Sequence, residues 1–185
     1  MTRDVPFANR VLFWTIAIGG ALFDLATKQI IFARVGQPGS PPVSVVRDVL
    51  ELRTSHNTGA LWGMGKNLPY SSTLFAGLSI AAALAICYWL FIKGAAVDRK
   101  LTACLGLIMA GAIGNCYDRL AFGYVRDFMD FHVKAIDFQC AIFNFADNML
   151  VIGSAGLMLM ALRPESPAVE PSAETTNVVR TGQTS

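Results

Sequence analysis

Four apolar runs of about 20 residues each dominate the sequence, and as α-helices each would match the thickness of a bilayer's hydrocarbon core. A backbone exposed to lipid has to satisfy its own hydrogen bonds, so we predict that every run is helical. The chain is 54% hydrophobic and 15% charged, which is more apolar than soluble domains usually are. We therefore predict an all-α integral membrane protein with four transmembrane helices, at about residues 11–32, 72–92, 101–120 and 140–162.

The distribution of Lys and Arg predicts which helix ends face the cytoplasm. The connection KGAAVDRK, residues 93–100, concentrates basic residues in a short loop, whereas those on the other side are spread over two longer loops. Positively charged short loops stay cytoplasmic, so residues 1–10 and both termini are predicted there as well. Residues 163–185 are rich in Pro, Ser, Thr and Glu and are predicted to form a disordered cytoplasmic tail.

The first outer loop has a different pattern. Its segment PPVSVVRDVLELRT, residues 41–54, roughly alternates apolar and polar positions and contains many β-branched residues. This pattern predicts a small extracytoplasmic β element that lies on the membrane surface.

Ionisable and amide side chains gather toward the outer end of three of the four runs. An i, i+3 spacing places Asn115 with Asp118, and Asn144 with Asp147, on one face of a helix. A charged side chain in hydrocarbon costs about 2.5–3.5 kcal/mol on insertion scales, so each charge needs a partner or a function. The second run contains no Asp, Glu, Lys, Arg or His and is predicted to be a scaffold.

Some of these charges can be explained as structural ion pairs. Asp24 and Lys28 have the i, i+4 spacing of a helical pair, and Asp118 could pair with Arg119 or with Arg126. A small transporter or proton-conducting protein would also bury acids and amides. Its polar residues should then continue across the bilayer midplane, whereas here they stop at one rim.

Asp127 and Asp147 fit the structural interpretation less well, because no Lys or Arg lies within one helical turn of Asp147. Two carboxylates held close together in a low-dielectric site cannot both ionise easily, so one of them keeps a proton. An aspartic protease needs this state, in which one carboxylate activates water and the other acts as the acid. His56 and His132 lack a second ligand at metal-binding spacing, so no metal site is predicted.

Five separated blocks of the sequence carry a resemblance to a known family. They are Asp24 with Lys28, HNTGALWG at 56–63, AGAIGNCYDR at 110–119, VRDF at 125–128 and FNFADN at 143–148. Together they resemble the lipoprotein signal peptidases, also called signal peptidase II or prolipoprotein signal peptidases. The resemblance extends from about residue 12 to residue 162.

The resemblance implies that Asp127 and Asp147 are catalytic and that Asp24 and Lys28 are structural. It implies a role at the site or its substrate for Asn57, Gly59, Asn115, Asp118, Arg119 and Asn144. The implied activity is an aspartic endopeptidase that removes the signal peptide from diacylglyceryl-modified prolipoproteins and cuts before the lipidated cysteine. It works without metal or cofactor in the bacterial cytoplasmic (inner) membrane, near the extracytoplasmic face, with prolipoproteins and membrane lipid as partners and no nucleic acid.

Several positions depart from the family's usual pattern. Ala110 stands where Gly is more common, Trp62 replaces Phe, and Gln139 with Cys140 replaces a Pro-containing approach to the last helix. None of these changes removes an acid, so they bear on substrate detail and helix packing.

Overall fold

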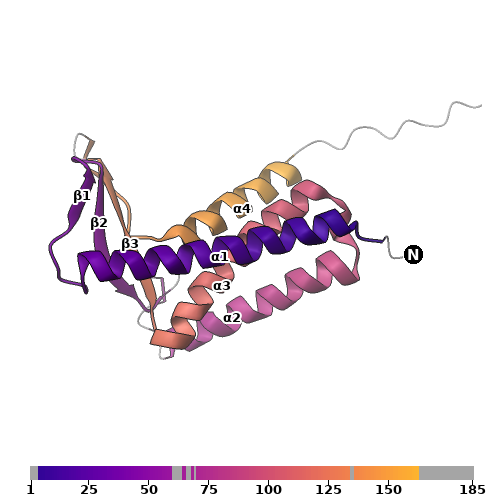
Figure 1. Cartoon of the computed structure of the whole chain (residues 1–185), viewed down its shortest axis with the longest axis horizontal. Helices are drawn as coiled ribbons and strands as arrows, with labels where there is room; N and C mark the ends of the chain where they lie inside the picture. Colours follow the sequence, from indigo (N-terminus) through magenta and orange to yellow (C-terminus); the bar gives the residue numbers. More distant parts are fainter. Residues whose placement is uncertain (1–3, 60–63, 66–67, 69, 134–135, 163–185) are drawn as a thin grey trace, which may run out of the picture.

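The computed structural model describes residues 4–59, 64–65, 68, 70–133 and 136–162. Its elements in chain order are α1 (Phe7–Val35), β1 (Val43–Val46), β2 (Leu50–Asn57), α2 (Ser71–Cys87), α3 (Arg99–Phe122), β3 (Val125–Val133), β4 (Phe138–Gln139) and α4 (Phe145–Ala161). A π-helical turn, Tyr88–Ile92, extends α2. The strands lie together at one end of the helices, here called the sheet end, and the start of α1 lies at the other (Figure 1).

Three helices are long and apolar enough to cross a membrane: α1, α2 with its π-helical turn, and α3. They carry large apolar side chains on their surfaces, among them Phe7, Leu22 and Leu84, as expected for helices in contact with lipid. The chain is thus an integral membrane protein. The described part of α4 is apolar but has 17 residues, about 26 Å of helix, so a fourth span stays a prediction.

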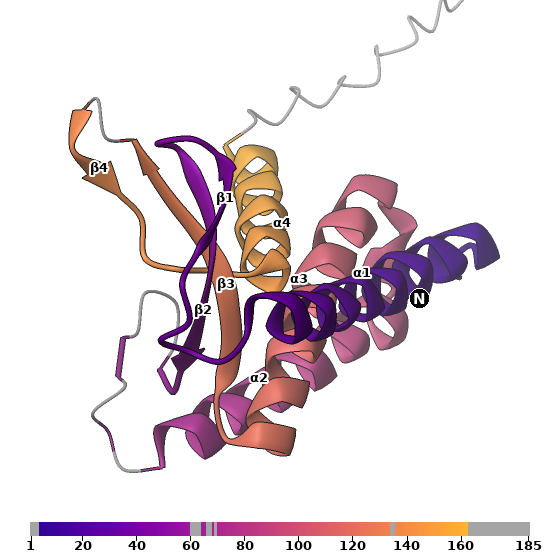
Figure 2. The ribbon, with the colours of Figure 1, turned by 60° about the vertical axis from the view of Figure 1, so that its left-hand side comes forward.

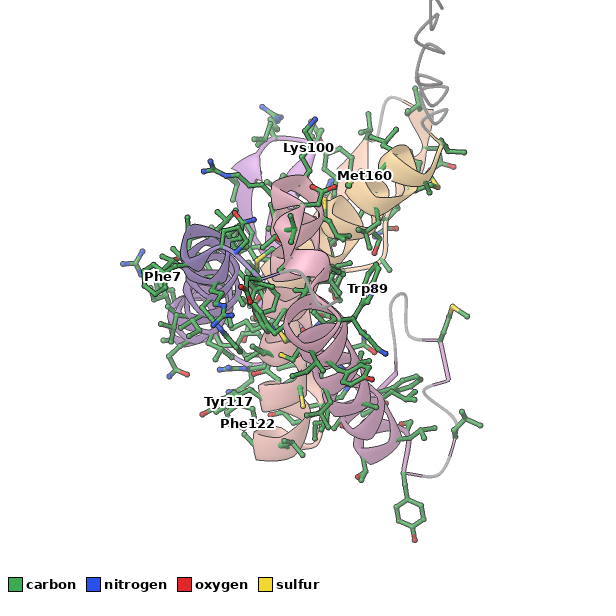
Figure 3. The ribbon with its side chains drawn as sticks, turned by 90° about the vertical axis from the view of Figure 1, so that its right-hand side faces the viewer. Phe7, Trp89, Lys100, Tyr117, Phe122 and Met160 are labelled. Atoms are coloured by element: carbon green, nitrogen blue, oxygen red, sulfur yellow. The ribbon has the colours of Figure 1, made fainter. Side chains whose placement is uncertain are left out.

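The helix α3 lies between the other three helices, as Figure 3 shows along the bundle from the end opposite the sheet. Close packing around α3 depends on positions without a side chain. A Cβ atom on Gly114 would lie 2.5 Å from Oδ2 of Asp24 on α1, and one on Gly153 of α4 would lie 2.7 Å from the carbonyl oxygen of Cys104. Glycine therefore lets α1 and α4 approach α3 closely.

Away from the sheet end the core is apolar. Phe13, Leu90, Leu105 and Met109 form its buried centre. The buried polar groups described there, such as Asn9, are uncharged, and Asn9 donates to the carbonyl oxygen of Ala96 at 2.7 Å. Among the described residues, no charged path extends from the sheet end through this core, which disfavours the transporter alternative.

The sheet is antiparallel in the order β1-β2-β3-β4 (Figure 2). The strands predicted between the first two helices are present as β1 and β2. The prediction missed β3, which follows α3 directly and pairs Asp130 with Glu51 and Val125 with Asn57. The sheet is therefore built from the α1–α2 connection and from the α3–α4 connection, and is not confined to the first.

The last helix begins at Phe145, five residues after the predicted start at Cys140. The preceding segment is extended because the carbonyl oxygen of Phe143 accepts hydrogen bonds from the backbone N–H groups of Phe128 and Met129. At the other end of the chain, α1 starts at Phe7, four residues earlier than predicted. The predicted disordered tail and the Trp62 position lie outside the described residues.

Candidate active site

A cavity of about 290 Å³ lies at the sheet end between α2, α3 and α4. Most of its wall is apolar, formed by Phe75, Leu78, Ala82, Ile108, Ala112, Val125 and Leu150. Asn57, Asn115, Arg119 and Asp147 also line it. An apolar chain can fill such a space while the polar groups fix its orientation.

Asp127 lies near the start of β3, and 2% of its surface is exposed. Its Oδ1 accepts a hydrogen bond from Nδ2 of Asn144 at 2.6 Å, and its Oδ2 accepts one from Nδ2 of Asn57 at 3.1 Å. Burial, and next the negative charge of Asp147, raise the pKa of Asp127 to about 7. The carboxyl group can therefore keep a proton near neutral pH.

Asp147 lies in the first turn of α4, where it forms a reciprocal cap with Asn144. The backbone N–H of Asp147 donates to Oδ1 of Asn144 at 3.0 Å, and the backbone N–H of Asn144 donates to Oδ2 of Asp147 at 3.2 Å. Asn115 on α3 donates from Nδ2 to the other oxygen, Oδ1, at 2.9 Å. The carboxylate is thus held from two elements while it borders the cavity.

Asn144 joins the two acids. Its Nδ2 contacts Oδ1 of Asp127 and also donates to Oδ1 of Asn115 at 3.2 Å, while its Oδ1 is held by the N–H of Asp147. The three predicted amides Asn57, Asn115 and Asn144 thus all contact a carboxylate of the pair. One side chain fixes both the start of α4 and the position of Asp127.

Four buried charged residues form a cluster that contacts Asn115 through Lys28. Lys28 forms ion pairs with Asp24 at 2.7 Å and with Asp118 at 3.2 Å. Asp118 also pairs with the guanidinium of Arg126 at 2.8 Å and accepts the Arg126 backbone N–H at 3.0 Å. Of the two partners considered for Asp118, the structure selects Arg126, and it adds Lys28. The cluster of Asp24, Lys28, Asp118 and Arg126 is electrically neutral, as burial requires.

Arg119 lies at the cavity's edge, where Nη2 donates to the carbonyl oxygen of Gly59 at 2.9 Å and Nη1 to that of Asn115 at 3.4 Å. Its buried Nε has no hydrogen-bond partner among the described residues. The Gly59 N–H donates to Oδ1 of Asn57 at 2.9 Å, which turns Nδ2 of Asn57 toward Asp127. Gly59 thus acts through its backbone.

A second polar group lies on another part of the sheet, and the sequence analysis missed it. Glu51, Asp130 and His132 have potential ligand atoms within 4.8 Å of one another. Arg53 pairs with Asp130 at 2.8 Å and with Glu51 at 3.1 Å, so the two acids share one cation. The sequence gives no signal for this group, because Glu51 and Asp130 become neighbours only when β2 pairs with β3.

We expect Asn144→Ala to slow any reaction that uses the two acids by about 10- to 100-fold, typical of the loss of a supporting polar partner. The change removes contacts with both acids and an N-cap worth about 1 kcal/mol. Initial rates and thermal unfolding of the detergent-purified protein measure the two effects. Asn148→Ala, further along α4, is the matched control, and equal rates for the two variants would contradict the role given to Asn144.

Comparison with known proteins supports a single family. Residues 16–163 match the family described as signal peptidase (SPase) II. The lipoprotein signal peptidase of Paraburkholderia phymatum is 38% identical over 164 residues, which cover 88% of this chain and 95% of that protein. The corresponding protein of Rhodopirellula baltica is 36% identical over 167 residues, which cover 83% of this chain and 73% of that protein. That of Staphylococcus aureus is 34% identical over 151 residues, with 82% and 88% covered.

Two solved structures, both described as bacterial membrane enzymes determined by the in meso method, share the fold. The one at 2.3 Å resolution has a TM-score of 0.75 at 30% identity, with 94% of this chain and 99% of that chain covered. The one at 1.9 Å has a TM-score of 0.70 at 32% identity, with 88% and 98% covered. Since the sequence match extends over most of the chain and the fold agrees, the chain belongs to the signal peptidase II family.

Proposed function

We propose that the chain is a membrane aspartic endopeptidase that removes signal peptides from diacylglyceryl-modified prolipoproteins and cuts before the lipidated cysteine. Its family supports the substrate class. The observation that carries the catalytic type is the pair Asp127 and Asp147, which Asn144 joins beside an apolar cavity. The pKa of Asp127, about 7, supports a shared proton at neutral pH.

The reaction needs one ionised and one protonated carboxyl group. The ionised group takes a proton from a water molecule as that water attacks the scissile carbonyl carbon, while the protonated group donates to the carbonyl oxygen. The tetrahedral intermediate then collapses: the C–N bond breaks, the amine leaves with the proton from the first carboxyl group, and the second carboxylate takes back the proton of the hydroxyl that formed from the carbonyl oxygen. Asn57, Asn115 and Asn144 hold the acids in place, and the guanidinium of Arg119, which lines the cavity, can contact the substrate backbone.

In this proposal α4 is the fourth span, both termini are cytoplasmic, and the sheet end lies at the extracytoplasmic face of a bacterial cytoplasmic membrane. A signal peptide is an apolar helix that ends near this face. The apolar wall of the cavity suits that helix or the attached acyl chains, while the polar edge suits the peptide bond to be cut.

Cleavage of a purified precursor tests the function. The detergent-purified chain is mixed with a diacylated prolipoprotein, with its unlipidated form, or with an ordinary secretory precursor, and the products are mapped by mass spectrometry. We expect a single cut before the lipidated cysteine, in the diacylated precursor alone. Equal cutting of the unlipidated form would contradict the substrate class, and no cutting of any precursor would contradict the activity.

We expect cleavage to fall as the pH rises through about 7, because the shared proton is lost and no acid remains for the carbonyl oxygen. In Asp147→Asn the negative neighbour is gone, so the pKa of Asp127 should fall while burial still keeps it above its ordinary value. Carboxyl ¹³C shifts of labelled aspartate, followed against pH, measure this value. An unchanged pKa for Asp127 would mean that the two carboxylates do not interact.

A further inference from the structure

We infer that Lys28 is a positioning residue of the proposed active site, because its buried ammonium sets the orientation of the Asn115 amide that holds Asp147. The inference rests on the proposed function and gives Lys28 more than the structural role expected from the sequence. Lys28 lies on α1 with none of its side chain exposed. It contacts neither acid of the pair directly in the described interactions, so it would act through Asn115.

The ammonium has three acceptors around it: Oδ2 of Asp24 at 2.7 Å, Oδ1 of Asn115 at 2.9 Å and Oδ2 of Asp118 at 3.2 Å. An ammonium group has three N–H donors and no acceptor; here it donates a hydrogen bond to Asn115 and forms ion pairs with the two carboxylates. The two carboxylates hold Lys28 in place. Their two negative charges balance the positive charges of Lys28 and Arg126. One of the ammonium N–H groups donates to Oδ1 of Asn115.

The chemistry of the ammonium decides which way this amide points. Oxygen and nitrogen of an Asn side chain are nearly the same size, and hydrogen bonds determine their positions. Because Lys28 can only donate, the atom of Asn115 that faces it has to be Oδ1. Nδ2 then faces Oδ1 of Asp147, to which it donates at 2.9 Å. The reversed amide would place its oxygen against a carboxylate and its N–H against a cation.

Asn144 supports the same orientation more weakly, because its neutral Nδ2 donates to Oδ1 of Asn115 at 3.2 Å. Hydrogen bonds from charged donors are about twice as strong as neutral ones, so Lys28 is the dominant of the two contacts. The positive charge also acts at a distance and lowers the pKa of Asp127 against the stronger effect of burial. Lys28 therefore affects both acids without touching either.

The test removes the ammonium without leaving an unpaired charge. Lys28→Met alone would leave Asp24 buried and uncompensated, which destabilises a fold strongly. Asp24→Asn keeps an oxygen for the Ala146 N–H at the start of α4, now 2.9 Å from Oδ1 of Asp24. The double variant Asp24→Asn, Lys28→Met is therefore neutral in its cluster, and Asp24→Asn alone is its reference. Asn9→Ala, at the far end of α1, controls for a loss of stability.

Relative to Asp24→Asn, we expect the double variant to lose about 10- to 100-fold in kcat with KM nearly unchanged. Its alkaline limb of activity should move to higher pH, because the loss of a cation raises the pKa of Asp127. The other charged groups around the pair, which stay in place, are Asp118 and Arg119 from α3 and Arg126 from β3. Asn9→Ala should lower the unfolding temperature without moving the pH profile.

Two outcomes overturn the inference. One is a double variant with the kcat and pH profile of Asp24→Asn. The other, which needs no substrate, is an unchanged pKa of Asp127 in the ¹³C titration of the two proteins. A native chain that leaves every precursor uncut would instead overturn the proposed function, and the ¹³C titration would still decide the role of Lys28.

Discussion

Asp147→Asn and Asp127→Asn should each reduce cleavage of a diacylated precursor by about 10⁴-fold, the upper range for removal of a general acid or base. Asparagine has the shape of aspartate but cannot carry the transferred proton. Each carboxylate now accepts hydrogen bonds from amide N–H groups, and an asparagine oxygen can still accept one of them. We therefore expect the variants to insert and fold, and the loss to appear in kcat.

The measurement compares initial rates at equal amounts of folded protein, with thermal unfolding curves as the control for structure. The double variant Asp127→Asn, Asp147→Asn should be little worse than either single variant, because the two acids act as one unit. Cleavage by Asp147→Asn at the native rate would make the acid structural and the proposed mechanism wrong. Independent losses that multiply in the double variant would argue against a shared proton.

Gly111→Ala should have the second largest effect, because it separates two of the helices that carry the site. A Cβ atom on Gly111 would clash with the main-chain carbonyl oxygen of Ala146 and lie 2.7 Å from Cγ of Leu150. Main chain cannot rotate away as a side chain can, so α3 and α4 have to move apart. Overpacking of this kind costs about 1–3 kcal/mol. Asn115 and Asp147 lie on these two helices, so we also expect cleavage to fall more than about 10-fold.

Gly77→Ala is the matched control, since a Cβ atom there meets nothing within 4 Å and the position lies inside α2. Alanine favours a helix over glycine by up to about 1 kcal/mol, so this variant should be as stable as the native chain or more so. Unfolding temperature and cleavage rate are measured for both proteins. If Gly111→Ala behaves like Gly77→Ala, the close contact between α3 and α4 is not required.

Much of the helical framework could be predicted because hydrocarbon imposes a simple rule on a sequence. Apolar runs of the right length located α1, α2 and α3, and alternation with β-branched residues located β1 and β2. In contrast, β3 escaped prediction, because Arg126, Asp127 and Asp130 are buried in it and break the apolar pattern of a buried strand. Polar residues that belong to a functional site can therefore mask the sequence pattern of the strand or helix on which they lie.

The polar residues were recognised individually, but apart from the pair of Asp118 with Arg126 their connections between elements were not predictable. Lys28 and Asn115 are 87 positions apart, and Asn57 and Asp127 are 70 apart. Spacing along one helix relates Asn144 to Asp147 and Asp24 to Lys28, whereas contacts between helices depend on how the bundle packs. The late start of α4 was missed for a similar reason: residues 140–144 are apolar enough to continue a helix, but pairing of Phe143 with Met129 keeps them extended.

The reciprocal cap between Asn144 and Asp147 has a consequence for biogenesis. Asn144 can meet Asp127 only when α4 has begun at Phe145 and docked beside β3, and α4 follows the other described helices along the chain. Until then Asp127 lacks one of its two amide donors and its acidic neighbour. Under the mechanism proposed above, a nascent chain with three helices inserted carries one isolated aspartate and cannot hydrolyse a peptide bond, so the activity should appear only after α4 has docked.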